Sequence, residues 1–271
     1  MARMALPRVL VTGSTGFLGP YATAALAASF EVVTVARTAG DVTADLADPV
    51  AASAALAALR PDFVLFLAAN ARIAECERDP DAARAINAES PGRMARGLGA
   101  KFVYVSTDLV FDGRAAPYRA LDGVGPLSAY ASTKAEGEER VLQSGGRVVR
   151  LPLLFGRDEK GRGASEMVRA SVQSGTPLSL FTNEYRTPLH GRDAARGLAS
   201  LLPRTDGARI VHLGGPERVS RWEFGRMLCL ANGWPTATLR PAECQDPLRP
   251  RDVSLRSEFA CRELGEMLAD S

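Results

Sequence analysis

A glycine-spaced segment near the start of the chain constrains its fold more than any other feature. An apolar run over residues 8–12 (RVLVT) leads into residues 13–19 (GSTGFLG), and an alanine-rich stretch follows over residues 21–28. Strand, glycine loop and helix in this order are typical of dinucleotide-binding turns, because glycines let the backbone approach a pyrophosphate at the helix N-terminus. The segment predicts such a turn, and a tight turn without a ligand is the alternative.

The alternation of strand and helix continues as far as Leu151. We expect strands at residues 31–36, 63–67, 102–106 and 147–151, and helices at residues 50–59, 80–98 and 126–145. The run FVLFL at 63–67 is apolar throughout, which indicates a parallel strand covered on both faces. These features predict an α/β fold, a Rossmann-like doubly wound parallel sheet.

Beyond Leu151 the alternation loosens and Gly, Pro and Arg become more frequent. We expect helices near residues 164–175, 192–202, 220–232 and 257–269, with strands near 178–181 and 209–213. A chain of 271 residues is long enough for one domain with an annexe. We expect an NAD(P)-binding domain at 1–155 plus about 186–215, and a smaller C-terminal substrate-binding cap at about 156–185 and 216–271.

The overall composition argues against several classes of function. The net charge is +2 and the basic residues form no run, so we expect neither nucleic-acid nor membrane binding. No apolar run is long enough to cross a membrane. The four cysteines lie far apart, so we expect no metal site and no disulfide framework, but reduced thiols in a cytoplasmic protein. Because the N-terminal segment runs directly into the first strand, we expect no cleaved signal peptide.

Tyr130 and Lys134 are the first candidate catalytic residues. They lie four residues apart in the expected helix at 126–145, where Ser128 is a candidate N-cap, so they share one face, one turn apart. An ammonium group beside a phenol lowers the pKa of the phenol, which suits proton donation near neutral pH. An exposed helix pair without a catalytic role is the alternative, and these two residues alone do not decide between the two.

Arg37 indicates which dinucleotide the chain prefers. It follows the expected strand at 31–36, where an acidic residue would accept hydrogen bonds from the ribose 2′-hydroxyl of NAD. A cation at this position suits the 2′-phosphate of NADP instead. We therefore favour NADP(H) as the cofactor, with NAD(H) possible, although an exposed loop arginine needs no special reason.

Polar residues also stand at the end of a later strand. Ser106, Thr107 and Asp108 close the apolar run that begins at Phe102, and open parallel sheets bind ligands at the carboxyl ends of their strands. The loop that follows, residues 109–127, is unusually long, which usually has a functional cause.

Taken together, several of these segments resemble the extended short-chain dehydrogenase/reductases. The resemblance rests on residues 12–19 (TGSTGFLG), 68–70 (AAN), Ser106-Thr107 and the Tyr130-x-x-x-Lys134 pair. Within that superfamily the chain is similar to dTDP-4-dehydrorhamnose reductases and related nucleotide-sugar ketoreductases, through residues 105–113 (VSTDLVFDG), 45–49 (DLADP), 87–92 (NAESPG) and Arg249-Pro250.

The resemblance implies roles for particular residues. Tyr130 would protonate a carbonyl oxygen as hydride arrives from the nicotinamide, Lys134 would hold the ribose hydroxyls, and Thr107 would orient the same oxygen. The implied cofactor-binding residues are Gly13, Thr15, Gly16, Phe17, Leu18, Gly19, Arg37, Asp45, Leu46, Ala68, Ala69, Asn70, Ser106, Tyr130 and Lys134. The implied substrate-binding residues are Thr107, Asp108, Tyr130, Leu153 and Arg249. The expected substrate is a nucleotide-sugar, no metal is expected, and a homodimer is a possible assembly.

Other members of the superfamily give the alternatives. Dehydratases need a glutamate where this chain has Leu109, which argues against dehydration. An epimerase uses much the same tyrosine and lysine and stays open. The regulatory subunit of methionine adenosyltransferase also resembles this subfamily, so a non-catalytic NADP-binding subunit is the non-enzyme alternative. Pro152-Leu153-Leu154, Arg119 after Tyr118, and His190 depart from the reductase pattern and leave the sugar open.

Overall fold

A seven-stranded sheet forms the centre of the fold in the computed structural model, which describes residues 5–271. In sheet order its strands are β11 (Ile210–His212), β6 (Arg147–Leu151), β5 (Phe102–Thr107), β4 (Phe63–Phe66), β1 (Arg8–Thr12), β2 (Glu31–Ala36) and β3 (Val42–Thr43). The pairs that β1 forms with β2 and β4 are parallel, as are the pairs β2 with β3 and β4 with β5. The expected Rossmann-like doubly wound sheet is confirmed.

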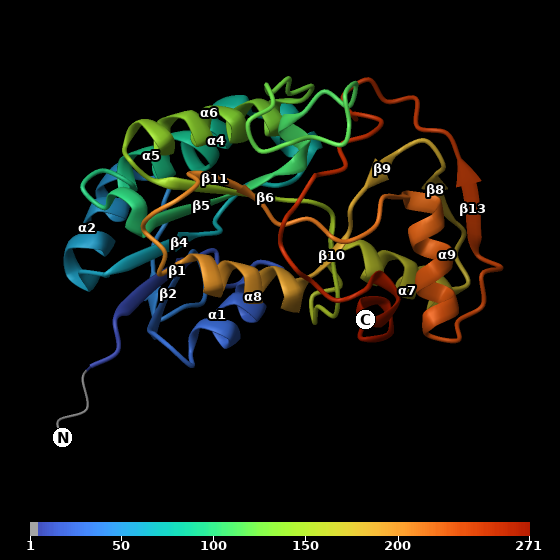
Figure 1. Cartoon of the computed structure of the whole chain (residues 1–271), viewed down its shortest axis with the longest axis horizontal. Helices are drawn as coiled ribbons and strands as arrows, with labels where there is room; N and C mark the ends of the chain where they lie inside the picture. Colours follow the sequence, from blue (N-terminus) through green and yellow to red (C-terminus); the bar gives the residue numbers. More distant parts are fainter. Residues whose placement is uncertain (1–4) are drawn as a thin grey trace. The chain divides into compact units, whose positions relative to one another are not determined.

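Helices cover both faces of this sheet, as the apolar strands require. In Figure 1, helices α4, α5 and α6 lie along one face, and α1 and α8 lie along the other. The bounds of the helices are α1 (Gly19–Leu26), α2 (Pro49–Leu59), α3 (Ile73–Arg78), α4 (Pro80–Arg84), α5 (Ser90–Met94), α6 (Ala129–Gln143) and α8 (Gly191–Leu201). Leu10, Val64, Phe66, Phe102 and Tyr104 are fully buried between the layers. Burying each such side chain contributes about 1.5–3 kcal/mol to stability.

The long helix expected over residues 80–98 is present over residues 80–94, with a π-helical turn in its middle. It consists of α4, a π-helical turn η1 (Ala85–Glu89) and α5, which ends at Met94. The π-turn coincides with Asn87, whose side chain bonds groups outside the helix. Gly97 and Gly99 have φ values of 81° and 54°, and this left-handed conformation prevents the helix from continuing. The expected helix is therefore present, but it ends at Met94 and not at residue 98.

Two compact units divide the chain. The first contains residues up to Ser106 together with Ser128–Val149 and Ala195–Val211. The second contains Thr107–Leu127, Arg150–Ala194 and His212–Ser271. The second unit thus takes in the long loop over 107–127, which the sequence grouped with the cofactor domain. Compactness does not define a functional domain, so the division into cofactor domain and substrate cap stays a prediction.

The second unit is built from short strands in pairs and three helices. Its elements are β7 (Leu154–Phe155), α7 (Ala164–Ser174), β8 (Leu178–Phe181), β9 (Tyr185–Arg186), β10 (Leu189–His190), β12 (Val219–Ser220), α9 (Arg221–Ala231), β13 (Leu239–Ala242) and α10 (Leu264–Ala269). Strand β7 pairs with β10 and β8 with β13 in parallel, and β9 pairs with β12 antiparallel. Helix α9 begins with a capping box between Ser220 and Glu223.

The last expected helix, residues 257–269, is shorter than its sequence pattern indicated. It begins only at Leu264, and the segment before it bonds both within itself, through Phe259 N to Ser257 Oγ at 3.1 Å, and to other parts of the chain. Leu255 N donates to Thr187 Oγ1 at 3.3 Å, and Ser257 Oγ donates to the His212 carbonyl oxygen at 2.9 Å. These bonds hold residues 254–261 as an extended strap.

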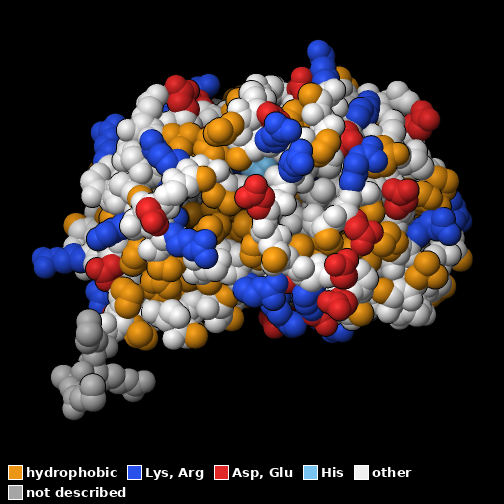
Figure 2. Space-filling view, viewed as in Figure 1, with side chains coloured by type: hydrophobic (Ala, Val, Ile, Leu, Met, Phe, Trp, Pro, Cys, Tyr) orange, Lys and Arg blue, Asp and Glu red, His pale blue; other side chains and the backbone are white. Residues whose placement is uncertain are grey.

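Three further observations concern the surface and the described residues. On the face shown in Figure 2, Lys and Arg side chains are interspersed with Asp and Glu side chains. From residue 5 to residue 271, no helix has both the length and the apolar character that a membrane crossing requires. Within the same range, His, Cys, Asp and Glu side chains do not gather into a group suited to a metal ion.

Candidate active site

The glycine loop after β1 is packed so tightly that larger residues cannot replace two of its glycines. Gly13 has a φ of 66°, and a Cβ atom there would lie 2.7 Å from the Ala68 backbone nitrogen. A Cβ atom on Gly19 would lie 2.1 Å from the Ser14 carbonyl oxygen. Thr12 Oγ1 accepts hydrogen bonds from Leu67 N and Ala68 N, both at 3.1 Å. The loop after β1 and residues 68–70 after β4 are thereby joined at one edge of the sheet.

The N-terminus of α1, directly after this loop, suits an anion. Its N-cap residue Leu18 makes no side-chain capping bond in the described part of the chain, Gly19 N donates to the Gly16 carbonyl oxygen at 3.3 Å, and Pro20 has no amide hydrogen. The helix dipole favours negative charge at this end. The residues present therefore fit the pyrophosphate of a dinucleotide.

The remaining expected cofactor residues of the first unit differ in their exposure. Thr15, Gly16 and Phe17 are half-buried, and Arg37 is exposed directly after β2. Asp45 is exposed, and its Oδ1 accepts a hydrogen bond from Ala47 N at 3.0 Å. Leu46, by contrast, is buried in the hydrophobic core.

Asn87 holds the loop after β4 in place. Its Oδ1 accepts from Asn70 N at 2.9 Å, and its Nδ2 donates to Asn70 O at 3.0 Å and to Thr133 Oγ1 at 3.1 Å. The side chain is fully buried, so the reciprocal pair is shielded from water. Asn87 therefore ties the loop at Asn70 to helix α6.

Tyr130 and Lys134 lie on the buried face of α6, not on an exposed one. The helix starts at Ala129 after Ser128, whose Oγ accepts from Ala131 N at 3.2 Å. Tyr130 is 9% exposed and Lys134 is 2% exposed. The simpler alternative of an exposed helix pair is thus wrong.

The ammonium group of Lys134 is held by two groups of strand β5. Its Nζ donates to the Val105 carbonyl oxygen at 2.7 Å and lies 3.9 Å from the centroid of the Tyr104 ring, a cation–π contact. The Tyr104 hydroxyl donates to the Asn87 carbonyl oxygen at 2.5 Å, which fixes the ring. Burial lowers the pKa of Lys134 to about 7, and Glu138 opposes the shift. Near neutral pH, Lys134 therefore populates both its charged and its neutral form.

In the second unit, Thr107 and Asp108 form one polar group at the end of β5. Thr107 Oγ1 donates to Asp108 Oδ1 at 3.2 Å and accepts from Leu109 N at 3.2 Å. Asp108 is 1% exposed and pairs with Arg186 Nη1 at 2.7 Å. Burial raises the pKa of Asp108, and Arg186 opposes the shift. The Thr107 hydroxyl is therefore oriented by a buried ion pair.

Sequence reasoning missed the charged cluster that continues from this pair. Glu184 accepts hydrogen bonds from Arg249 at 2.9 Å and from Arg186 at 3.4 Å, and its side chain is 3% exposed. Burial lowers the pKa of Arg221 to about 10, although Glu184 opposes the shift. Three arginines thus meet the two acids Asp108 and Glu184. The alternating charges of Glu184 and Arg186 beside an apolar strand were the signal that could have revealed the cluster.

Of the expected substrate residues, Arg249 belongs to this cluster. Leu153 is half-buried, and its carbonyl oxygen accepts from Leu189 N at 3.0 Å. Each unit therefore brings its own expected residues together: the dinucleotide loop, Asn70, Tyr130 and Lys134 in the first, and Thr107, Asp108 and Arg249 in the second.

The whole fold is similar to those of solved reductases. It matches dTDP-4-dehydrorhamnose reductase from Bacillus anthracis, solved in complex with NADP, with a TM-score of 0.87 and 21% identity over 97% of each chain. The orthologue from Clostridium acetobutylicum gives a TM-score of 0.84 and 26% identity, again over 97% of each chain.

Two kinds of relative are similar in sequence, and a family model covers nearly the whole chain. One is dTDP-4-dehydrorhamnose reductase from Streptomyces griseus, 35% identical over 217 residues, which are 76% of this chain and 70% of that enzyme. The other is methionine adenosyltransferase 2 subunit beta from Pongo abelii, 34% identical over 212 residues. That match covers 72% of this chain and 63% of the subunit, less than two thirds of its length. Residues 7–269 match the model of the RmlD substrate binding domain, and the chain belongs to that family.

Proposed function

We propose that the chain is an NAD(P)H-dependent reductase of a nucleotide-linked keto-sugar. The observation that carries the proposal is the buried pair of Tyr130, 9% exposed, and Lys134, 2% exposed, on one face of α6. Burying a lysine costs free energy because its charged form loses hydration, so a structural role alone gives little reason to keep it there. A proton donor and a neighbouring amine at this position fit ketone reduction.

In this proposal the residues of the chain bind, orient and deliver a proton. Tyr130 protonates the substrate carbonyl oxygen through its hydroxyl, and Lys134 hydrogen-bonds ribose hydroxyls. The Thr107 hydroxyl turns from Asp108 Oδ1 and donates to the same carbonyl oxygen. A nicotinamide cofactor, when bound, supplies the hydride. The glycine loop at Gly13 and the positive end of the α1 dipole hold the pyrophosphate.

We further propose that the cofactor is NADP(H) rather than NAD(H). Arg37 stands exposed at the end of β2, where it can reach a 2′-phosphate. The similar reductase from Bacillus anthracis was solved with NADP. Asp45, Leu46, Ala68 and Ala69 complete the proposed cofactor site.

The proposed substrate is a nucleotide-sugar bound by the second unit. Arg186 is buried between Asp108 and Glu184, whereas the Arg249 side chain is 37% exposed and pairs with Glu184 at 2.9 Å and with Asp246 at 3.8 Å. Arginine forks suit the oxygens of a diphosphate. Leu153 supplies an apolar contact for the sugar in this proposal.

The test is a cofactor-oxidation screen against nucleotide-linked 4-keto-6-deoxy sugars. We expect NADPH consumption with at least one of them, loss of turnover in Tyr130→Phe by about a hundredfold or more, and unchanged NADPH binding in that variant. Tyr185→Phe, a matched change in the second unit, should leave turnover intact. Full activity of Tyr130→Phe would overturn the mechanism.

A second candidate function is that of a non-catalytic NADP-binding subunit. The 34% identity to methionine adenosyltransferase 2 subunit beta favours it. In that case the purified chain would bind NADPH, consume none with any sugar of the screen, and bind the catalytic subunit of a methionine adenosyltransferase. An epimerase would instead convert a nucleotide-sugar without net NADPH consumption. The homodimer also stays a prediction.

A further inference from the structure

The second unit contains a cavity that none of the proposed catalytic residues lines. Its volume is about 430 Å³. Its walls come from Pro117, Thr187, the turn at residues 214–216, Arg218 and the strap at 254–261. Cavities that hold small organic ligands range from about 300 to 1,000 Å³, so this one is large enough for a single small molecule.

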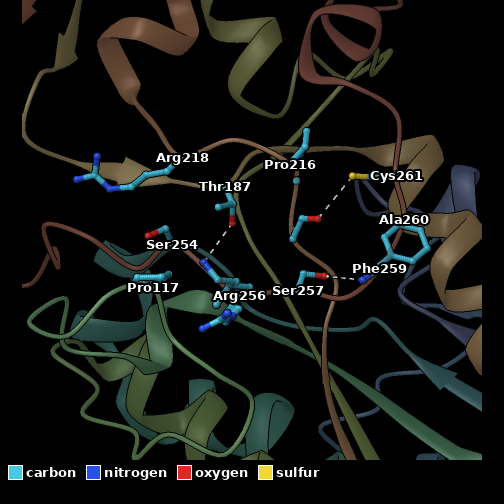
Figure 3. A pocket seen from close by; sticks show the side chains of 13 residues that line it. Pro117, Thr187, Pro216, Arg218, Ser254, Arg256, Ser257, Phe259, Ala260 and Cys261 are labelled. Atoms are coloured by element: carbon cyan, nitrogen blue, oxygen red, sulfur yellow. Dashed lines mark hydrogen bonds between the residues drawn. The ribbon is translucent and has the colours of Figure 1, made fainter.

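Hydrogen bonds between the wall segments keep the cavity open and shaped before any ligand arrives. Leu255 N donates to Thr187 Oγ1, as drawn in Figure 3, and Gly215 N donates to the Thr187 carbonyl oxygen at 3.0 Å. A Cβ atom on Gly215 would lie 1.8 Å from the Pro188 carbonyl oxygen, so the turn packs directly against this segment. Arg256 N donates to the Tyr118 carbonyl oxygen at 2.7 Å and anchors the strap. The site is therefore largely preformed, which lowers the entropic cost of binding.

The charged side chains of the wall are both cations. Arg218 and Arg256 line the cavity, and no aspartate or glutamate does. Arg218 is already paired, since its Nε lies 2.6 Å from Asp252 Oδ2 and its guanidinium lies 3.6 Å from the Tyr185 ring centroid. Across residues 5–271, the Arg256 guanidinium forms no hydrogen bond or ion pair. Arg256 is exposed, so its guanidinium is hydrated and is free to exchange this water for an anionic ligand.

The other surfaces of the cavity are apolar or carry hydroxyl groups. The half-buried Phe259 ring stands on one side of the view in Figure 3 and Pro117 on the other. The 5% exposed Thr187 accepts a bond from Leu255 through its Oγ1, so its hydroxyl hydrogen is available as a donor. A ligand here meets a cation at one end and apolar surface around its body.

We propose that this cavity binds a small organic carboxylate, with its charged end at Arg256 and a planar or apolar body between Phe259 and Pro117. A carboxylate matches the planar guanidinium fork in two parallel hydrogen bonds. The ligand is either a carboxylated sugar of the nucleotide-sugar substrate or a separate carboxylic acid. Both sources share this chemistry, and the inference does not depend on the proposed reduction.

Cys261 supplies a reporter inside the cavity. It lines the wall and is half-buried, whereas Cys76, Cys229 and Cys244 are buried. We would therefore follow its reaction with an anionic reagent, 5,5′-dithiobis(2-nitrobenzoate), and with a neutral one, 4,4′-dithiodipyridine. Arg256→Gln should slow the anionic reagent about fivefold and leave the neutral one unchanged, because a nearby charge is worth about 1 kcal/mol. Arg240→Gln, an exposed arginine outside the cavity, is the matched control, and Cys261→Ser identifies the reacting thiol.

The ligand is identified by adding candidate compounds and measuring how much each one slows the reaction of Cys261 with the neutral reagent. We expect benzoate to protect it saturably in the wild type and at least fivefold more weakly in Arg256→Gln. Stronger protection by UDP-glucuronate than by UDP-glucose would assign the carboxylate to the sugar of a substrate; protection by benzoate alone would assign it to a separate ligand. Equal protection by inorganic phosphate and by benzoate would overturn the proposal. So would an equal ratio of the two Cys261 reaction rates, with the anionic and with the neutral reagent, in the wild type and in Arg256→Gln. None of these readouts requires enzymatic activity, so failure of the proposed reduction would not affect them.

Discussion

At the scale of single residues, Lys134 is the group whose chemistry depends most on its surroundings. The chain has three lysines, Lys101, Lys134 and Lys160, so isotope-labelled lysine gives three side-chain signals. We expect the Lys134 signal to titrate near pH 7, because burial lowers its pKa to about 7. The signals of the other two lysines serve as references in the same spectrum. A Lys134 signal that stays in the charged form up to pH 9 would contradict this expectation.

The ring face of Tyr104 should stabilise the charged form of Lys134. The ring centroid lies 3.9 Å from Lys134 Nζ, and a cation–π contact favours the charged amine by about 0.5–2 kcal/mol. Tyr104→Leu should therefore lower the pKa of Lys134 further, by about half a unit or more. Tyr104→Phe keeps the ring and is the matched control; it should leave this pKa nearly unchanged while removing the hydroxyl bond to Asn87. An equal shift in both variants would exclude the ring as the cause.

A further prediction for a single residue concerns Arg37 and the choice between NADPH and NADH. A charge-assisted bond to the 2′-phosphate contributes about 1.5–3 kcal/mol, so Arg37→Ala should weaken NADPH binding by roughly tenfold to a hundredfold. NADH lacks this phosphate, so its affinity should change little. Fluorescence titration of the two reduced cofactors measures both effects. Equal weakening of both would show that Arg37 does not bind the phosphate.

At the scale of elements, Gly137 allows helix α6 to pack against the π-turn. A Cβ atom there would lie 2.2 Å from the Asn87 carbonyl oxygen and 2.7 Å from the Tyr104 hydroxyl oxygen. Gly137→Ala should therefore lower the free energy of unfolding by about 1–3 kcal/mol, although alanine is the better helix former. Gly265 in α10 has open space around it, so Gly265→Ala should raise the same free energy by up to about 1 kcal/mol. Chemical denaturation measures the free energy of unfolding of both variants. A change of the same sign in both would contradict the packing argument.

Elements that depend on local pattern were predictable, and elements that depend on distant partners were not. The strands at 8–12, 31–36 and 147–151 agree with their expected bounds, because continuous apolar runs between turn residues leave few alternatives. The helix expected at 257–269 begins only at Leu264, and the segment before it contacts His212 through Ser257, a residue far away in sequence.

The same distinction holds for the candidate site. The spacing of Tyr130 and Lys134 predicts a shared helix face, but only the packing of α6 determines that this face is buried. The glycine loop and Asn87 were visible as motifs, since backbone turns need particular residues. The cluster around Glu184 and Arg186 joins segments far apart in sequence, so the local alternation of these two charges indicates only one part of it. Arg256 was missed for the same reason.

At the scale of the whole molecule, the two units differ in the groups that titrate in weak acid. Both histidines, His190 and His212, belong to the second unit and are buried. Burial, helped by Arg262 near His190 and by Arg150 near His212, lowers the pKa of each imidazole to about 4. Both tryptophans, Trp222 and Trp234, also belong to the second unit, so their fluorescence reports on its unfolding.

Acid should therefore destabilise the second unit through its histidines. Below pH 6.5 the unfolded chain binds protons that the buried imidazoles do not, so the free energy of unfolding falls as pH drops from 6.5 to 4 and this contribution levels off below 4. Each histidine contributes a slope of up to about 1.4 kcal/mol per pH unit. Denaturation followed by tryptophan fluorescence should give a shallower pH slope in the His190→Gln/His212→Gln variant than in the wild type. The comparison uses slopes, because packing changes shift the absolute stability without changing its pH dependence. Identical slopes would mean that both imidazoles take up protons in the folded chain, and the buried environment of the second unit would then have to be more open to water than its side-chain packing indicates.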